Sequence, residues 1–479
     1  VPAIQADNEY ALRSVLIGGE TSRADARDES QQLDPFSQLY KQGDVISPPY
    51  PPLEMSMLPE HSDILGAIID ALAVNIDGQG HRMVAYPDVD EDSPDVQEEK
   101  ARTEAFFDSC SSEGFTQLRM DKRRDQEPIG YAFFEVLRET FTSARARRQR
   151  KAQNRVELGL PAMRVEDDGD ERHPWRFVHV PAYTVRLCAL KDEDGEPVEA
   201  IEYRRLEGRW EKETVRRTFR KFVQILSENP SKKRYFREFG DPRGMDADTG
   251  KYYDSEDAVP QGKTRATELA YFRHKSGRTP YGISPFAGVM LNIAGTRKTQ
   301  ELNYSRLRNN MIPPLFLLIS GGGLTKGSVQ RMEEKLKEMK GLDRFSAIML
   351  LEALAPKPKG KDLLEPSGPA GAVKIEVKEV AQSVPGDALF MKYTEANHKI
   401  IRARRRVPPI LIGLAEDYSY ATAFVSLKMF DEQVCDPERG SFDAWVNGQV
   451  LPRLGIHDWR FQSNGITTGQ MAEVAKLIE

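Results

Sequence analysis

A short acidic run is the first feature of the sequence that could do chemistry. Asp88, Asp90, Asp92 and Glu99 stand at carboxylate positions of a 12-residue calcium-binding loop. The sixth position is Ser93, where the sharp turn of such a loop needs glycine. Charge runs of this kind are usually solvated surface loops. We therefore interpret the run as an acidic loop without a metal. A DNA-processing enzyme that uses the three aspartates on a metal ion is kept as an alternative.

A glycine-rich stretch, residues 321–328, is the second candidate. Its sequence GGGLTKGS leads into a predicted helix, as phosphate-binding loops do. In those loops the lysine follows a glycine and precedes serine or threonine, whereas here Lys326 precedes Gly327. We interpret the stretch as a strand-to-helix turn. The sequence contains no HExxH or GxSxG motif either, so we predict no catalytic residue, no metal, no cofactor and no enzymatic activity.

Two local basic clusters could neutralise phosphates if they faced nucleic acid. The first consists of Arg145, Arg147, Arg148, Arg150, Lys151 and Arg155, and the second of Arg402, Arg404, Arg405 and Arg406. The alternative interpretation is a solvated helix face or a strip of salt bridges between subunits. Lys and Arg total 68 against 74 for Asp and Glu, which gives a net charge of −6. That balance argues against a dedicated nucleic-acid-binding protein, and a soluble DNA-binding regulator remains a third possibility.

The overall composition is that of a polar globular protein. The 479 residues are 39% hydrophobic and 30% charged, and the length suggests about three domains. No apolar run in the sequence approaches the roughly 18 residues that span a bilayer. Cys110, Cys188 and Cys435 lie far apart, which is typical of a reducing compartment without a disulfide scaffold. The sequence starts without methionine and stops within a periodic pattern, so we expect the natural chain to continue.

The elements that must position these residues change in type along the chain. A polar, proline-rich arm precedes a helical segment, and strand-like runs separated by turn residues fill the middle. From Ser284, a good N-cap before Pro285, apolar residues recur at helical spacing. Further helices are predicted over residues 328–340 and 387–406. The face predicted to be apolar in the latter consists of Leu389, Tyr393, Ala396 and Ile400. The fold class is therefore α+β.

Several short motifs, taken in order, resemble those of tailed-bacteriophage portal proteins. They are GYAFFEVLR at 130–138, VPAYTVR at 180–186, YFREFGDPR at 235–243, PYGISP at 280–285, NNMIPP at 309–314 and VPPILIG at 407–413. Each motif is short, and their joint order over most of the chain carries the resemblance. It implies a portal-type fold with an α/β wing, a β-rich clip, a long stem helix and a helical crown.

The resemblance also implies where these parts lie in this sequence. They are an arm (1–52), the first part of the wing (53–175), the clip with flanking strands (176–280), the stem helix (281–312), the second part of the wing (313–386), the channel helix and tunnel loop (387–422) and the crown (423–479). Within the tunnel loop, roughly residues 413–422, Asp417, Tyr418 and Tyr420 are the side chains expected to face the channel.

The function implied by the resemblance is that of a ring, dodecameric in the virion, at one capsid vertex. Double-stranded DNA would pass through its axial channel during packaging, retention and ejection. The expected partners are further copies of the chain, the major capsid protein, the terminase large subunit and the head-tail adaptor protein, with no membrane. The expected location is the virion, and the host cytoplasm during assembly. A net negative charge suits such a channel, because many fixed phosphate contacts would hold the DNA in place.

Overall fold

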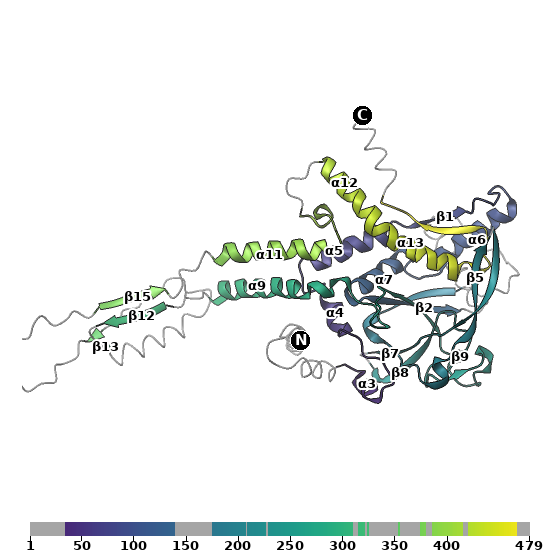
Figure 1. Cartoon of the computed structure of the whole chain (residues 1–479), viewed down its shortest axis with the longest axis horizontal. Coiled ribbons are helices and arrows are strands. Elements are labelled where there is room, and N and C mark those ends of the chain that lie inside the picture. The colour runs from purple at the N-terminus through teal and green to yellow at the C-terminus, as the bar shows by residue number, and fades with distance from the viewer. Residues whose placement is uncertain are drawn as a thin grey trace, which may run out of the picture. The chain divides into compact units, whose positions relative to one another are not determined.

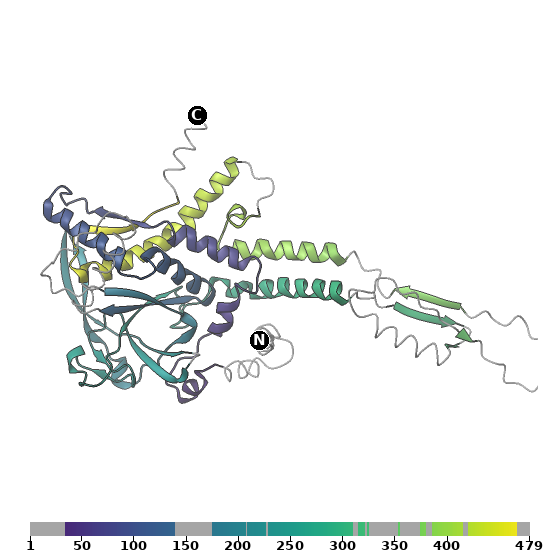
Figure 2. The ribbon, with the colours of Figure 1, turned by 180° about the vertical axis from the view of Figure 1, so that it is seen from behind.

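A computed structural model describes residues 34–138, 175–206, 208–226, 229–309, 315–320, 323–324, 353–354, 374–379, 386–414 and 420–466 (Figures 1 and 2). The chain divides into two compact units. The first, called the body below, is Val1–Leu291 with Ile400–Glu479, and the second, the helix-pair unit, is Asn292–Lys399. Both contain helices and strands, which confirms the α+β class. No helix among the described residues is long and apolar enough to cross a membrane.

A six-stranded sheet forms the centre of the body, in the order β3-β2-β11-β8-β7-β4. The strands are β2 (Tyr131–Arg138), β3 (Trp175–Val180), β4 (Val185–Leu187), β7 (Lys221–Leu226), β8 (Asn229–Glu238) and β11 (Glu268–Arg273). All neighbours are antiparallel except β8 and β11, which pair in parallel. Strand β2 lies between β3 and β11 and is buried over its first six residues, as its nearly continuous apolar sequence suggests.

This sheet joins parts of the chain that the sequence predicted separately. Strand β2 comes from the segment 53–175, and the other five strands lie in or begin at the edge of the segment 176–280. The predicted strand runs themselves are confirmed. The reason for the joint sheet is that a strand as apolar as β2 needs partners on both edges, and its neighbours in sequence cannot provide them all.

An aromatic core fills the body beside the sheet. It is enclosed by α6 (Pro94–Ser109), α7 (Phe115–Ile129), α13 (Asp436–Trp445) and the antiparallel pair β1 (His81–Ala85) and β16 (Trp459–Ser463). The ring of Phe115 lies 5.9 Å from that of Phe461 and 6.1 Å from that of Phe442. The pairing of β1 with β16 therefore closes the core with a strand from near the C-terminus, and Figure 1 shows the two strands side by side.

Shorter elements complete the body. They include α3 (Ser37–Gln42), α4 (Pro52–Met57), α5 (Leu65–Leu72), η1 (Ala73–Asp77), the hairpin of β5 (Val198–Leu206) and β6 (Arg209–Arg217), η6 (Pro409–Ile412), α12 (Tyr420–Phe430) and η7 (Asp431–Cys435). The three cysteines are buried and free.

Two long helices dominate the helix-pair unit, α9 (Met290–Asn309) and α11 (Gly386–Ala403), and they run side by side in both views (Figures 1 and 2). The predicted start of the first is confirmed, since the hydroxyl of Ser284 accepts a hydrogen bond from the amide of Phe286 ahead of α9. Strand β12 (Leu315–Ser320) pairs with β15 (Lys374–Glu379), and β13 (Gly323–Leu324) pairs with β14 (Ala353–Leu354).

The contact between α9 and α11 includes a buried polar cluster, which the apolar residues aligned on the second helix did not indicate. The amide of Asn397, only 2% exposed, accepts from Asn292 Nδ2 at 2.9 Å and donates to Thr296 Oγ1 at 3.2 Å. Gly295 leaves room for the ring of Tyr393, since a Cβ there would lie 2.3 Å from the tyrosine hydroxyl. Because the helices meet through this amide, Tyr393 remains 44% exposed.

Several predictions fall outside the described residues. These are most of the arm, the basic cluster at 145–155, most of the glycine-rich stretch and the helix over 328–340.

Candidate functional site

The site is built on a helix whose buried face is charged. Arg119, Lys122, Arg123, Gln126 and Glu127 of α7 recur at the spacing of an amphipathic stripe, yet every one of them is buried. A position of this kind is normally apolar, because burying a charge is costly unless it is paired. The pattern therefore requires partners on the neighbouring elements η1 and α13.

Asp77, at the end of η1, is the first of these partners and is fully buried. Arg123 Nε donates to Asp77 Oδ2 at 2.8 Å, Arg119 Nε donates to Oδ1 at 3.3 Å, and Lys122 Nζ lies 3.8 Å from Oδ1. Burial raises the pKa of Asp77, but the three cations outweigh that effect and hold it at about 2. The carboxylate is thus charged at every physiological pH and fixes three cations at once.

The aromatic core shares in holding the same cations. The guanidinium carbon of Arg119 and the ammonium of Lys122 each lie 4.7 Å from the ring centre of Phe442. Aromatic faces attract cations, and the effect grows when water is excluded. Even so, burial lowers the pKa of Lys122 to about 8 despite the attraction of Asp77.

The charged chain continues from α7 to the turn that follows α11. Arg123 Nη1 contacts Glu438 Oε2 of α13 at 2.9 Å, and Arg405 Nη2 contacts Glu127 Oε1 at 2.6 Å and Glu438 Oε1 at 3.0 Å. Burial raises the pKa of Glu438, but Arg123, His274 and Arg405 outweigh this and hold it well below its usual range. Two carboxylates and two guanidinium groups therefore alternate along this line.

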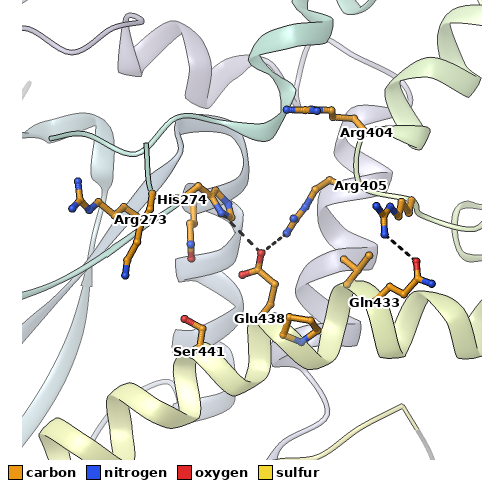
Figure 3. Close-up of a pocket in the computed structure, with 12 residues that line it drawn as sticks. Arg273, His274, Arg404, Arg405, Gln433, Glu438 and Ser441 are labelled. Carbon is orange, nitrogen blue, oxygen red and sulfur yellow. Dashed lines mark hydrogen bonds and ion pairs between the residues drawn. The ribbon is translucent and has the colours of Figure 1, made fainter. Parts of the chain in front are cut away.

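The line ends in an open pocket of about 580 Å³ (Figure 3). Figure 3 shows Arg405 and His274 pointing toward Glu438 from opposite sides. The pocket is lined by Gln126, Arg273, His274, Lys275, Arg404, Arg405, Arg406, Gln433, Val434, Pro437, Glu438 and Ser441. Burial lowers the pKa of His274, so its imidazole is neutral at neutral pH. The lining is strongly polar, and most of its charged groups are cations.

The same arrangement bears on metal binding. Glu127, His274 and Glu438 form the one group of ligating side chains spaced for a metal ion among the described residues, with ligand atoms within 4.8 Å of one another. Arg123 and Arg405 already neutralise both carboxylates at ion-pair distance. A divalent cation would have to displace a guanidinium group, so the geometry fits an ion-pair network better than a metal centre.

The second basic cluster has divided roles in the structure. Arg405 turns inward to the two glutamates, whereas Arg404 and Arg406 are exposed. Arg404 Nε donates to the carbonyl of Pro285, and Arg406 Nη1 donates to Gln433 Oε1 at 2.9 Å. Arg406 also has a positive φ of 53°, which is uncommon for a residue with a side chain. Arg404, Arg405 and Arg406 thus do not form a uniform solvated helix face.

The acidic run does not converge on a metal. Asp88 pairs with Arg205 at 2.6 Å, and Asp90 Oδ1 accepts from the amide of Asp92. Glu99 lies on α6, where Oε1 accepts from the amides of His457 and Asp458 at 2.9 and 2.7 Å. The carboxylates thus serve separate local contacts, which argues against the metal-dependent alternative.

The predicted tunnel-loop residues are only partly placed. Asp417 and Tyr418 lie outside the described residues, and Tyr420 is the first residue of α12. Sequence reasoning missed Asp77, Glu438 and the charged face of α7. A signal was present, because Arg119, Arg123 and Glu127 follow one another at intervals of four between two phenylalanine-rich segments.

The resemblance of the motifs to those of portal proteins is supported by comparison with known proteins. No family model matches the chain. The phage-like element PBSX protein XkdE of Bacillus subtilis (strain 168) is 30% identical over 452 residues, which cover 93% of this chain and 82% of the relative. The chain therefore belongs to the family of XkdE, the portal proteins of tailed phages.

Other comparisons give further similar chains. The uncharacterized protein YqbA of the same organism is 31% identical over 456 residues, with 93% of this chain and 80% of the relative covered. A chain in the virion of a native gene transfer agent particle is 12% identical, covers 94% of this chain and 93% of its own, and has a TM-score of 0.48. An HK97 family phage portal protein from Corynebacterium diphtheriae is 11% identical, with 91% and 99% covered and a TM-score of 0.39.

Proposed function

We propose that the chain is one subunit of a portal ring that forms the DNA channel at a capsid vertex. The observation that carries this proposal is the helix-pair unit, which buries an amide and leaves large apolar side chains in solvent. Tyr304 on α9 is 64% exposed and Met391 on α11 is 65% exposed. Apolar groups exposed on long helices are typical of surfaces that other protein chains cover. A heterologous contact repeated by rotation closes into a ring.

In this proposal the ring is dodecameric and acts without catalysis. Its partners are the major capsid protein, the terminase large subunit, the head-tail adaptor protein and the DNA that passes through it. The separate contacts of Asp88, Asp90 and Glu99 support a role without metal chemistry. The protein would reside in the virion, and in the host cytoplasm during assembly.

The boundaries of the arm, wing, clip, stem, channel and crown remain predictions, and a second segment is also a candidate for the clip. The clip was predicted over residues 176–280, whose strands mostly belong to the body sheet. Strands between residues 315 and 379 instead pair with one another within the helix-pair unit. This segment is therefore a second candidate for the clip.

Native mass measurement, with electron microscopy of the same sample, tests the ring. We expect a closed multimer for the natural chain, and smaller species for the double variant Tyr304→Glu, Met391→Glu, because charges cannot be buried between subunits without partners. Lys392→Glu is the control, since it also adds negative charge at an exposed position of α11. If the natural chain remains a monomer or dimer at every concentration, the ring proposal is contradicted.

The tunnel loop is tested separately by Tyr420→Lys. If Tyr420 faces the channel, an added cation attracts DNA phosphates and changes DNA retention, while rings still form. The measurement compares DNA retained in packaged particles with the yield of rings. Loss of rings together with retention would place Tyr420 in a subunit contact instead.

A further inference from the structure

The pocket beside Glu438 carries positive charge that the described residues do not neutralise. Arg273, Lys275, Arg404 and Arg406 line it, and none of the four has a carboxylate within ion-pair distance among the described residues. Their hydrogen bonds go to neutral groups: Arg273 and Arg404 donate to the carbonyls of Pro280 and Pro285. Neutral acceptors orient a guanidinium group and leave its charge in place.

Deeper in the same pocket, buried polar atoms lack partners. Within the described part of the chain, Gln126 Oε1, His274 Nε2 and Arg405 Nε have no hydrogen-bond partner, although all three residues line the pocket. Gln126 is 6% exposed, so its side chain is held inside the protein. Buried polar atoms are nearly always satisfied in folded proteins, by protein, water or a ligand. Arg405 Nε is a donor without a partner, and His274 Nε2 donates in one tautomer, so these two atoms together with the unneutralised cations of the lining point to an anionic ligand.

We infer that this pocket binds a phosphate group, and that its source is the backbone of duplex DNA. Guanidinium groups match phosphate oxygens in geometry as well as charge, and Arg404 and Arg406 contribute two of them to the lining of the pocket. A volume of about 580 Å³ accommodates a phosphate with its flanking sugars. Of the ion-pair network, Arg405 and Glu438 also line the pocket, and their pairing at 3.0 Å holds the guanidinium group of Arg405 in place there.

The choice of DNA as the source rests on the proposed function. Arg404 and Arg406 lie in the chain just before residues 413–422, the predicted tunnel loop, so a DNA channel would pass near them. A few contacts per subunit would restrain DNA without fixing it, because each contact contributes a modest, salt-dependent share of the affinity. This gives the second basic cluster a role that a net charge of −6 conceals.

The test compares two matched triple variants of the full chain. The first is Lys275→Gln, Arg404→Gln, Arg406→Gln, in the pocket. The control removes three exposed cations from the β5–β6 hairpin of the body, as Arg209→Gln, Lys212→Gln, Arg216→Gln. Both variants carry three fewer positive charges, so non-specific attraction falls equally. Binding of a labelled duplex of about 30 base pairs is measured by fluorescence anisotropy over a range of salt concentrations. A duplex of this length offers many more phosphates than the few that one pocket contacts.

We expect the pocket variant to bind the duplex on the order of tenfold more weakly than the control does. The slope of the logarithm of the binding constant against the logarithm of the salt concentration should be shallower by about 0.9 for each phosphate that the pocket no longer neutralises. Calorimetry with inorganic phosphate distinguishes the sources: weak phosphate binding together with strong duplex binding supports DNA, whereas phosphate binding without duplex binding limits the site to small phosphates. Equal duplex binding by both variants overturns the inference. Weaker subunit association of the pocket variant, with duplex binding unchanged, would assign the pocket to carboxylates of a neighbouring copy and overturn it as well.

Failure here is distinguishable from failure of the proposed function. Rings that form normally but show no difference between the variants reject the phosphate site and leave the portal proposal standing. Chains that never form rings but bind phosphate at this pocket reject the ring and leave the site standing.

Discussion

The body and the helix-pair unit bury different kinds of polar group. In the body, Arg119, Arg123 and Asp77 are completely or almost completely buried, among aromatic rings. In the helix-pair unit, an amide is buried and Tyr304 and Met391 lie in solvent. The body thus pairs these buried charges with one another, whereas the helices of the helix pair meet through a neutral amide and expose apolar side chains of the kind that other chains cover.

Removing the shared anion of the body should have the largest effect. Asp77→Asn leaves Arg119, Lys122 and Arg123 buried without their carboxylate, and we expect the free energy of unfolding to fall by about 3 to 5 kcal/mol. Urea unfolding followed by tryptophan fluorescence measures it, because Trp445 and Trp459 belong to the body core. The exposed pair of Asp70 and Arg124 supplies the control, and Asp70→Asn should cost less than about 1 kcal/mol.

Equal losses for the two substitutions would show that the buried charge network of the body contributes no more to stability than a surface pair. A larger loss at Asp77 alone would show that the charges of the body are held by one another.

Acid should weaken the body through the same residue, by a smaller amount. The folded pKa of Asp77 is about 2, below its ordinary value of 3.8, so its stabilising contribution is complete above about pH 4 and is lost as the pH falls toward 2. The shift corresponds to about 2 kcal/mol. We expect the difference in stability between the natural chain and Asp77→Asn to shrink over this window. A difference that stays constant from pH 5 to pH 2 would contradict the assignment, because other carboxylates titrate in both proteins.

The sequence predicted those features that depend on local pattern. The strand runs, the N-cap at Ser284 and the long helices were visible because turn residues and apolar periodicity mark them. The motifs alone also identified the portal family. The joint sheet was not foreseen, since pairing β2 with β11 depends on contacts across more than a hundred residues, which periodicity does not encode.

The charged site was missed for a different physical reason. Apolar spacing is the usual sign of a buried helix face, and α7 fills that spacing with Arg119, Lys122 and Arg123. Such a face is expected to be solvated unless its partners are known, and Asp77 and Glu438 are remote from it in sequence. The apolar residues aligned on α11 did not indicate how that helix packs. It contacts α9 through Asn397, while Tyr393 and Ile400 are 44% and 46% exposed.

The smallest effect is expected in the helix-pair unit, and it tests the comparison from the other side. Asn397→Ala removes the hydrogen bonds to Asn292 and Thr296, and we expect a loss of about 1 to 2 kcal/mol that is confined to this unit. Hydrogen exchange of backbone amides in α9 and α11, with α7 as the internal reference, measures it. Glu395→Ala, at an exposed position of the same helix, should change protection by less than about 0.5 kcal/mol. If protection in α7 fell as much as in α9, the two units would unfold together. The helix pair would then not be the separately assembled part that its polar contact and exposed apolar residues indicate.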